Sequence, residues 1–234
     1  MKTSGPILEV CGIKFLNVPH AADVLDEVLV QDCYNINEIP DGCVVVDVGA
    51  FYGEFGLLCS AVKGCPVFGF EPSKTNHSIA QFNTYLNYGR ISTKQINIKH
   101  AAIGSRNGTA TFFHREDHPA GSSLSEMPES IPETVQVLRL SRVVESILSK
   151  LGDRRRICIK MDCEGSERDI FDNDPGWMDQ VKIVTMEWHN HDGDYYGGLL
   201  EQRGFKVHLE GGGPKPRPKW DKSIGGGMLF ATKL

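Results

Sequence analysis

Along most of the chain, short apolar runs alternate with longer segments in which apolar residues recur at helical spacing. Short apolar runs bounded by turn residues indicate buried strands, whereas helical spacing indicates helices with one buried face. Five runs after residue 42 predict strands: CVVVDV, PVFGFEP, INIKHAAIG, RICIKMD and VKIVTMEW. Helices are expected at 53–64, near 74–88, at about 141–151, from 165 onward and at 195–203.

The order of these elements predicts the topology of the sheet. Strands that alternate with helices are joined by parallel crossovers, which gives a doubly wound sheet with helices on both faces. The last two runs, GFKVHLE and GGMLFATKL, have no helix between them and are expected to pair antiparallel. The predicted fold class is therefore α/β and Rossmann-like, with a mostly parallel seven-stranded sheet and an antiparallel strand near the C-terminal end.

Two segments depart from the alternation. Residues 7–18 alternate around a Cys-Gly pair and predict a hairpin, and residues 20–31 predict a short helix. Two strand-like runs within 105–140 flank a loop that is rich in Ser, Pro and Glu. We therefore expect an N-terminal hairpin-and-helix extension at 1–42 and a main domain at 43–234, with an irregular insertion at about 105–140.

Composition and charge narrow the functional classes. The 234 residues carry 25 Lys and Arg against 30 Asp and Glu, and a net charge of −5 argues against a nucleic-acid partner. No apolar run is long enough to span a membrane, and the N-terminus lacks the apolar segment of a signal peptide. The seven cysteines include no CxxC pair and indicate reduced, buried thiols, so a cytoplasmic location is expected. Nothing in the sequence indicates the oligomeric state.

The stretch VVVDVGAFYGEFG (44–56) predicts a strand that runs into a glycine loop and then into a helix. In open α/β sheets, ligands bind beyond the carboxyl ends of the strands. Gly49 and Gly53 allow the backbone to turn tightly beside a ligand, and Glu71 at the end of the second strand suits the hydroxyls of a ribose. Both NAD and S-adenosylmethionine fit these features.

Two details favour S-adenosylmethionine over NAD. The glycines follow GxxxGxxG instead of the dinucleotide pattern GxGxxG. Asp47 places a negative charge where it would repel a pyrophosphate and attract an ammonium or a sulfonium, although a cap for the next helix is the alternative role for this residue. In addition, no tyrosine is followed four residues later by the lysine that short-chain dehydrogenases need.

Six stretches of the chain resemble, in this order, the FkbM-type methyltransferases: VVVDVGAFYG, VFGFEPS, HAAIGSRNGTATF, GSSLS, ICIKMDCEGSE and IVTMEWH. The most specific part is IKMDCEGSE, which is close to the family's Lys-x-Asp-x-Glu-Gly-x-Glu. The resemblance implies a class I, Rossmann-like methyltransferase that uses S-adenosylmethionine and most often methylates a hydroxyl, commonly on a sugar or glycan. Phe51 departs from the family pattern, in which a polar residue, often Asn, is expected.

These features predict the residues of a cofactor site. Asp47 is expected at the methionine amino end, and Glu71, followed by Pro72, at the ribose. Ala101 and Ala102 are expected to flank the adenine, with ordinary core alanines as the alternative. The glycine loop supplies the remaining contacts, from Gly49, Ala50, Phe51 and Gly53.

A second group of residues is expected to act on the methyl acceptor. Asp162 ends the fourth strand, which should lie beside the first, and Glu187 and His189 end the fifth. These three are the predicted catalytic residues, because a hydroxyl must be aligned with the sulfonium and must lose its proton. A hard divalent cation held by the same residues is the less favoured alternative to a side-chain base. Glu164 and Glu167 are expected to stabilise the start of the next helix.

The acceptor itself is expected to be a small molecule or a glycan. Segment 211–223 carries four basic residues in an acidic protein, and it is either a solvated loop or a binding site for an anionic acceptor: Lys215, Arg217, Lys219 and Lys222. Two other functions remain open, a nicotinamide-dependent oxidoreductase and a non-catalytic module that binds the cofactor. The acidic residues that follow the fourth and fifth strands count against the module.

Overall fold

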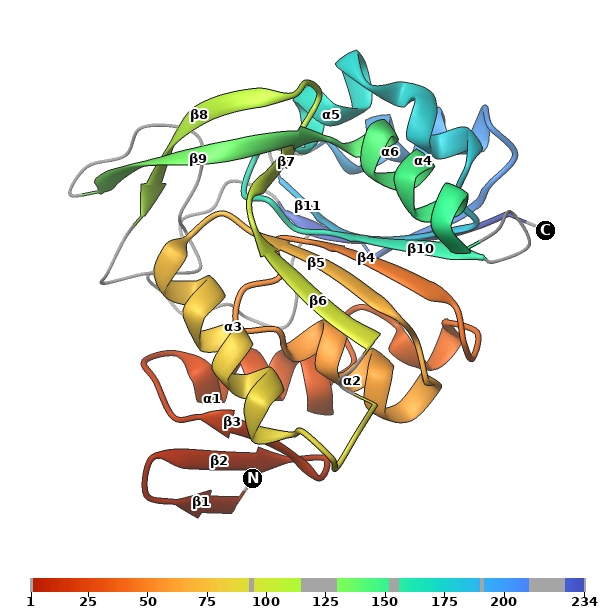
Figure 1. The fold of residues 1–234 in the computed structure, drawn as a ribbon. Helices are drawn as coiled ribbons and strands as arrows, with labels where there is room; N and C mark the ends of the chain where they lie inside the picture. The colour runs from red at the N-terminus through yellow and green to blue at the C-terminus, as the bar shows by residue number, and fades with distance from the viewer. Residues whose placement is uncertain are drawn as a thin grey trace.

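The computed structural model describes residues 2–92, 95–114, 130–151, 156–189, 192–210 and 226–233, and it is built on a seven-stranded sheet (Figure 1). The strand order is β12-β13-β11-β10-β4-β5-β6. The strands of this sheet are β4 (Val44–Val48), β5 (Val67–Glu71), β6 (Ile96–His100), β10 (Ile157–Met161), β11 (Ile183–Trp188), β12 (Lys206–Glu210) and β13 (Gly227–Thr232).

The pairing of the strands confirms the predicted topology. Strand β4 lies between β5 and β10 and is parallel to both, and the pairs β5–β6 and β10–β11 are parallel as well. Strand β13 is antiparallel to both of its neighbours, β11 and β12. The fold is therefore the Rossmann-like α/β class, with the fourth predicted strand beside the first.

Helices cover both faces of the sheet because successive side chains of a strand point to opposite faces. On β4, Val44, Val46 and Val48 pack in one hydrophobic cluster with side chains from α4, α5 and α6. Val45 packs on the opposite face, in a cluster with residues of α2. The helices are α2 (Glu54–Lys63), α3 (Lys74–Leu86), α4 (Leu140–Leu151), α5 (Glu167–Asn173) and α6 (Gly193–Glu201), with a 3-10 turn, η5 (Pro175–Asp179), after α5.

The N-terminal strands lie below α2 and α3 in the view of Figure 1. The predicted hairpin is present as β2 (Ile7–Val10) and β3 (Ile13–Leu16), but a further strand, β1 (Lys2–Ser4), was not foreseen. The predicted helix consists of α1 (Ala21–Leu25) and a π-helical turn, η1 (Asp26–Val30), and a 3-10 turn, η2 (Ile36–Glu38), follows. The expected boundary at residue 43 stays a prediction. Residues on both sides of it pack in one hydrophobic cluster.

The third predicted strand, 96–104, is wrong in its length. It is divided into β6 and β7 (Ala102–Gly104), and β7 leaves the main sheet to pair with β9 (Ile131–Arg139), which also pairs with β8 (Gly108–His114). The break follows from the neighbouring strand, because β5 ends at Glu71, opposite His100, and the next residue is Pro72, which has no N–H to donate. Ala101 makes the last bond, from its N–H to the carbonyl of Glu71 (3.2 Å).

Most of the cysteines lie at least partly inside the protein. All seven cysteines are free thiols, and four of them are buried: Cys43, Cys59, Cys65 and Cys158. Within the part of the chain that the structure describes, none of the helices has both the length and the apolar composition needed to cross a membrane.

Gly49 sits where the loops after β4 and β10 meet, and its replacement should test how tightly they pack. Its φ is 77°, and a Cβ built on it would lie 1.8 Å from the carbonyl oxygen of Asp162. Gly49→Ala should therefore lower the free energy of unfolding by two contributions. One is the strain of alanine in a left-handed conformation, and the other is the clash with the backbone of Asp162, which should add at least about 2 kcal/mol because backbone atoms cannot move aside easily. Urea denaturation measures this loss.

Gly12 provides a matched control for that substitution. It has the same φ of 77°, but nothing lies within 4 Å of the Cβ position. Gly12→Ala should show only the cost of the left-handed backbone, about 1–2 kcal/mol. Equal losses in the two variants would contradict the close contact between the two loops.

Candidate functional site

The carboxyl ends of β4, β5, β10 and β11 lie at one edge of the sheet because these strands are parallel neighbours. The loops after β4 and β10 are in backbone contact there. The N–H of Asp162 donates to the carbonyl of Val48 (3.1 Å), and the position of Gly49 leaves no room for a Cβ. The two predicted groups of site residues, for cofactor and for acceptor, are therefore adjacent.

The glycine loop is held by bonds from its own backbone. Gly49 and Ala50 both donate to the carbonyl of Phe70 (3.0 Å each), and Gly53 donates to the carbonyl of Ala50 (2.7 Å). Phe51 has a φ of 47°, in the left-handed region where Asn is enriched among non-glycine residues. This conformation gives a physical reason for the Asn that the family resemblance led us to expect at this position.

Glu71 links this loop to the loop after β5. Its Oε2 accepts a hydrogen bond from the N–H of Phe51 (2.8 Å), and its Oε1 accepts one from the N–H of Ser73 (2.9 Å). Burial raises the pKa of Glu71 to about 8, although both of these hydrogen bonds act in the opposite direction. A carboxylate oxygen has two lone pairs, so each oxygen can still accept a further donor.

The other predicted cofactor residues lie around Glu71. The carbonyl of Pro72 lies 2.9 Å from Nε2 of His100. Ala101 is fully buried in the main core beside the backbone of Glu71, whereas Ala102 begins β7 and packs in the cluster of the small sheet. The two alanines therefore face different surroundings.

Asp47 is paired inside the protein with a lysine of the neighbouring strand. Lys160 lies opposite Asp47 in the β4–β10 register, and its Nζ is 3.4 Å from Oδ1 of Asp47 and 2.6 Å from the carbonyl oxygen of Gly49. Burial raises the pKa of Asp47, and Lys160 opposes this effect. Burial alone would lower the pKa of Lys160, but the surrounding carboxylates raise it, so the amine stays charged.

A further buried carboxylate, Glu54, lies at the start of α2. Its Oε2 accepts a hydrogen bond from the N–H of Tyr52 (3.1 Å), and burial raises its pKa to about 8 in spite of the attraction of Lys160. The charge of Lys160 thus acts to lower the pKa values of Asp47, Glu54 and Glu71. Its Nζ also lies 3.9 Å from Oδ2 of Asp162. Among the described residues it is the one lysine or arginine that is buried, so the carboxylates at this edge exceed the buried cations.

The N-terminal segment contributes Tyr34, for which the sequence holds no signal. Its hydroxyl donates to Oδ2 of Asp162 (2.8 Å), 128 residues away, and Oγ1 of Thr185 donates to its carbonyl (2.9 Å). The Nζ of Lys160 lies 5.2 Å from the centre of its ring. Burial and the charge of Asp162 raise the pKa of Tyr34, so the phenol remains a donor.

The three predicted catalytic residues lie together. His189 is the centre of the group, with its Nε2 3.7 Å from Glu164 and 4.0 Å from Glu187. Asp162, Glu164 and His189 each offer one atom that could bind a metal ion, and these three atoms lie within 4.8 Å of one another. Burial lowers the pKa of His189, but Glu167 and the nearby carboxylates outweigh it and raise that pKa to about 10, so this imidazole is charged at neutral pH and cannot accept a proton.

Glu167 lies at the start of α5, as expected, whereas Glu164 does not. Glu167 is the first residue of α5, and its Oε1 accepts a hydrogen bond from the N–H of Cys163 (3.0 Å). The same oxygen lies 3.3 Å from Nδ1 of His189. Glu164 lies before the helix, with a φ of 52°, and its carboxylate faces His189 instead of the helix.

Two segments for which the sequence raised expectations fall outside the described residues. These are the GSSLS stretch (121–125) and the basic segment 211–223.

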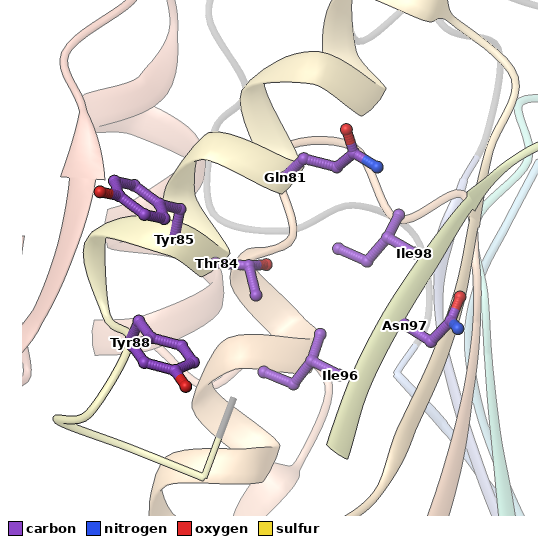
Figure 2. A pocket seen from close by; sticks show the side chains of 7 residues that line it. All are labelled: Gln81, Thr84, Tyr85, Tyr88, Ile96, Asn97 and Ile98. Carbon is purple, nitrogen blue, oxygen red and sulfur yellow. The ribbon is translucent and has the colours of Figure 1, made fainter. Parts of the chain in front are cut away.

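A shallow hollow of about 410 Å³ lies away from this edge, between α3 and β6 (Figure 2). It contains none of the predicted site residues. Its lining is uncharged and includes two exposed tyrosines: Gln81, Thr84, Tyr85, Tyr88, Ile96, Asn97 and Ile98.

This chain is similar to two methyltransferases of known sequence. Methyltransferase 1 of Beauveria bassiana (strain ARSEF 2860) is 23% identical over 215 residues, which cover 83% of this chain and 82% of that protein. Methyltransferase sdnD of Sordaria araneosa is 23% identical over 216 residues, which cover 79% and 82% of the two chains.

A solved structure shares the fold. The FkbM methyltransferase of Methylobacillus flagellatus KT aligns with a TM-score of 0.55 and 18% identity, over 83% of this chain and 44% of that one. The model of the FkbM methyltransferase domain matches residues 47–207, which include every predicted site residue. This chain therefore belongs to the FkbM family of methyltransferases, whose methyl donor is S-adenosylmethionine.

Proposed function

We propose that this chain transfers the methyl group of S-adenosylmethionine to a hydroxyl oxygen of a sugar, a glycan or another small molecule. The observation that carries the proposal is the excess of carboxylates over buried cations at the carboxyl edge of the sheet. Asp47, Glu54 and Glu71 are all at least 95% buried, and they share Lys160 with Asp162. Burial raises the pKa of Glu54 and of Glu71 to about 8, and a cationic ligand would favour the ionised form of each.

The sign of this charge separates the two candidate cofactors. S-adenosylmethionine carries a sulfonium and an ammonium, whereas NAD carries a pyrophosphate that Asp47 would repel. This supports a methyl donor and counts against the nicotinamide-dependent oxidoreductase.

The predicted cofactor residues take the following roles in the proposal. Glu71 accepts hydrogen bonds from the ribose hydroxyls, next to Pro72, and Ala101 and Ala102 border the adenine. The loop of Gly49, Ala50, Phe51 and Gly53 presents its backbone to the methionine part. Oδ1 of Asp47 already faces Lys160 at 3.4 Å. Asp47 therefore attracts the ammonium through its negative charge and not through a hydrogen bond to this oxygen.

The acceptor lies against the residues that follow β10 and β11. Asp162, Glu187 and His189 orient its hydroxyl, and positioning of this kind supplies much of the rate of a transfer reaction. Tyr34 fixes Asp162 through its hydrogen bond (2.8 Å). The buried thiols support a cytoplasmic location.

Incubation with S-adenosylmethionine labelled in its methyl group tests the function directly. With a panel of sugars, glycans and other hydroxylated compounds, neutral and anionic, label should pass to an oxygen of at least one acceptor. Mass spectrometry and NMR locate the methyl group. Label that appears on carbon or nitrogen would contradict O-methylation, and tight S-adenosylmethionine binding without transfer to any acceptor would favour the non-catalytic module.

Glu71→Gln tests the assignment of the ribose contact. Loss of the charged acceptor should weaken binding of S-adenosylmethionine by about 1–3 kcal/mol, the usual cost of losing a charged hydrogen bond. Isothermal titration calorimetry measures it. Glu145→Gln, which removes an exposed partner of Arg142, should leave the affinity unchanged, and an unchanged affinity in Glu71→Gln as well would contradict the assignment.

The affinity for S-adenosylmethionine should also rise with pH. Glu54 and Glu71 have pKa values of about 8 without ligand, and a cationic ligand favours their ionised forms, so binding lowers both pKa values and releases protons. The affinity should therefore increase between about pH 6 and about pH 8, by up to roughly tenfold per pH unit for each group, and then level off. Calorimetry in buffers of different ionisation enthalpy counts the released protons.

Glu54→Gln is the matched variant for this measurement. Binding of S-adenosylmethionine to this variant should release fewer protons than binding to the wild type. Protons from the cofactor's own amino group contribute equally to both measurements, so they drop out of the difference. If wild type and variant release equal numbers of protons, the excess of buried carboxylates is not what holds the cofactor.

A further inference from the structure

The two ring nitrogens of His189 have different surroundings. Its Nδ1 lies 3.3 Å from Oε1 of Glu167, a side chain that is 1% exposed and is held in place by the N–H of Cys163. Its Nε2 faces the carboxylates of Glu164 and Glu187. Nδ1 makes no hydrogen bond within the described residues, so Glu167 lies beside it as a charged neighbour. A metal-binding histidine usually has a carboxylate beside the ring nitrogen that does not bind the metal.

The distances around Nε2 do not suit hydrogen bonds. The nearest oxygens of Glu164 and Glu187 lie 3.7 Å and 4.0 Å away, whereas a charged hydrogen bond is close to about 2.8 Å. Two ligands that share one cation at about 2.1 Å are separated by about 3.0 Å when adjacent and about 4.2 Å when opposite. The 3.7 Å between Nε2 and Glu164 lies between these two values, and the ligand atoms of Asp162, Glu164 and His189 lie within 4.8 Å of one another, so the three must draw closer to share one ion.

Asp162 completes the set from the neighbouring strand end. Tyr34 and Lys160 both contact its Oδ2, at 2.8 Å and 3.9 Å. Its Oδ1 is buried and has no hydrogen-bond partner among the described residues. Such an oxygen is costly to bury unless a ligand satisfies it.

We propose that Asp162, Glu164 and His189 bind a divalent cation, with Glu167 as the residue that orients the imidazole. Two carboxylates and an imidazole suit Mn²⁺ or Zn²⁺ better than Mg²⁺, which prefers oxygen ligands and holds its water tightly. Glu187 lies beside the cation, 4.0 Å from Nε2 of His189.

The catalytic role that we assign to the cation rests on the proposed function, methyl transfer to a hydroxyl. The acceptor hydroxyl binds the cation, which lowers the pKa of that hydroxyl so that its proton passes to Glu187 and then to solvent. The resulting oxygen attacks the methyl carbon, the C–O bond forms as the C–S bond breaks, and the sulfonium becomes the thioether of S-adenosylhomocysteine.

Binding of Mn²⁺ tests the site without any acceptor. The full chain is treated with EDTA, exchanged into metal-free buffer and titrated with Mn²⁺, and electron paramagnetic resonance measures the free ion. The wild type should bind one Mn²⁺. Glu164→Gln and His189→Ala should each weaken binding at least tenfold, and Glu167→Gln should weaken it by about 10–100-fold, as expected for a residue that supports a ligand.

His208→Ala is the matched control, because His208 lies 3.6 Å from Glu210 in an exposed pair that has no third ligand within the described part of the chain. This variant should bind Mn²⁺ as the wild type does. Glu164 is partly exposed, so Glu164→Gln should fold normally, and circular dichroism verifies this for each variant. No binding by the wild type up to about 1 mM, the weak end for protein cation sites, overturns the proposal, as does equal binding by all variants.

The outcome separates this site from the proposed function. Methyl transfer at full rate by metal-free protein in EDTA overturns the cation and leaves O-methylation intact. Site-specific binding of Mn²⁺ by a protein that methylates no hydroxyl supports the cation and contradicts O-methylation.

Discussion

The contact of Lys160 with the carbonyl of Gly49 and the carboxylate of Asp47 is the interaction on which the site depends. It joins β10 to β4 and fixes the start of the glycine loop, while the same amine lies near Asp162 and over the ring of Tyr34. A lysine that is 2% exposed is stable only because carboxylates surround it. Removing one member of such a buried pair usually costs about 3–5 kcal/mol, so the loop, the acceptor residues and the N-terminal segment are coupled through one charge.

The N-terminal segment is part of the site as well as of the core. Its residues pack in the same cluster as Val45 and Phe55, and this packing carries Tyr34 to the end of β10. Tyr34 also stands edge-on to Phe55, with ring centroids 5.5 Å apart. An extension that looks separable in the sequence therefore determines how Asp162 is oriented.

The sequence predicts what depends on periodicity and on local motifs. Buried valines predict β4, and the lack of a helical pattern between the last two apolar runs of the sequence predicts the antiparallel pairing of β13, because both features are local. The division between β6 and β7 depends instead on where β5 ends, which is a property of another strand. Tyr34 is similar, since its partner is 128 residues away and no spacing marks it. Lys160 did carry a signal, as a charge within an apolar run, but its partners became evident only through the strand register.

The two proposed ligands make opposite demands on the carboxylates of this edge. Negative charge near Asp47 and Glu54 favours the sulfonium of the methyl donor, yet the same field disfavours loss of a proton from an acceptor hydroxyl a few ångströms away. Lys160 cannot resolve this conflict alone, because its charge is already shared between Asp47 and Asp162. A divalent cation between Asp162, Glu164 and His189 would reverse the sign of the field at the acceptor while leaving it negative at the cofactor. The proposed chemistry would use the two groups of carboxylates separately, one near the ends of β4 and β5 and the other near the ends of β10 and β11.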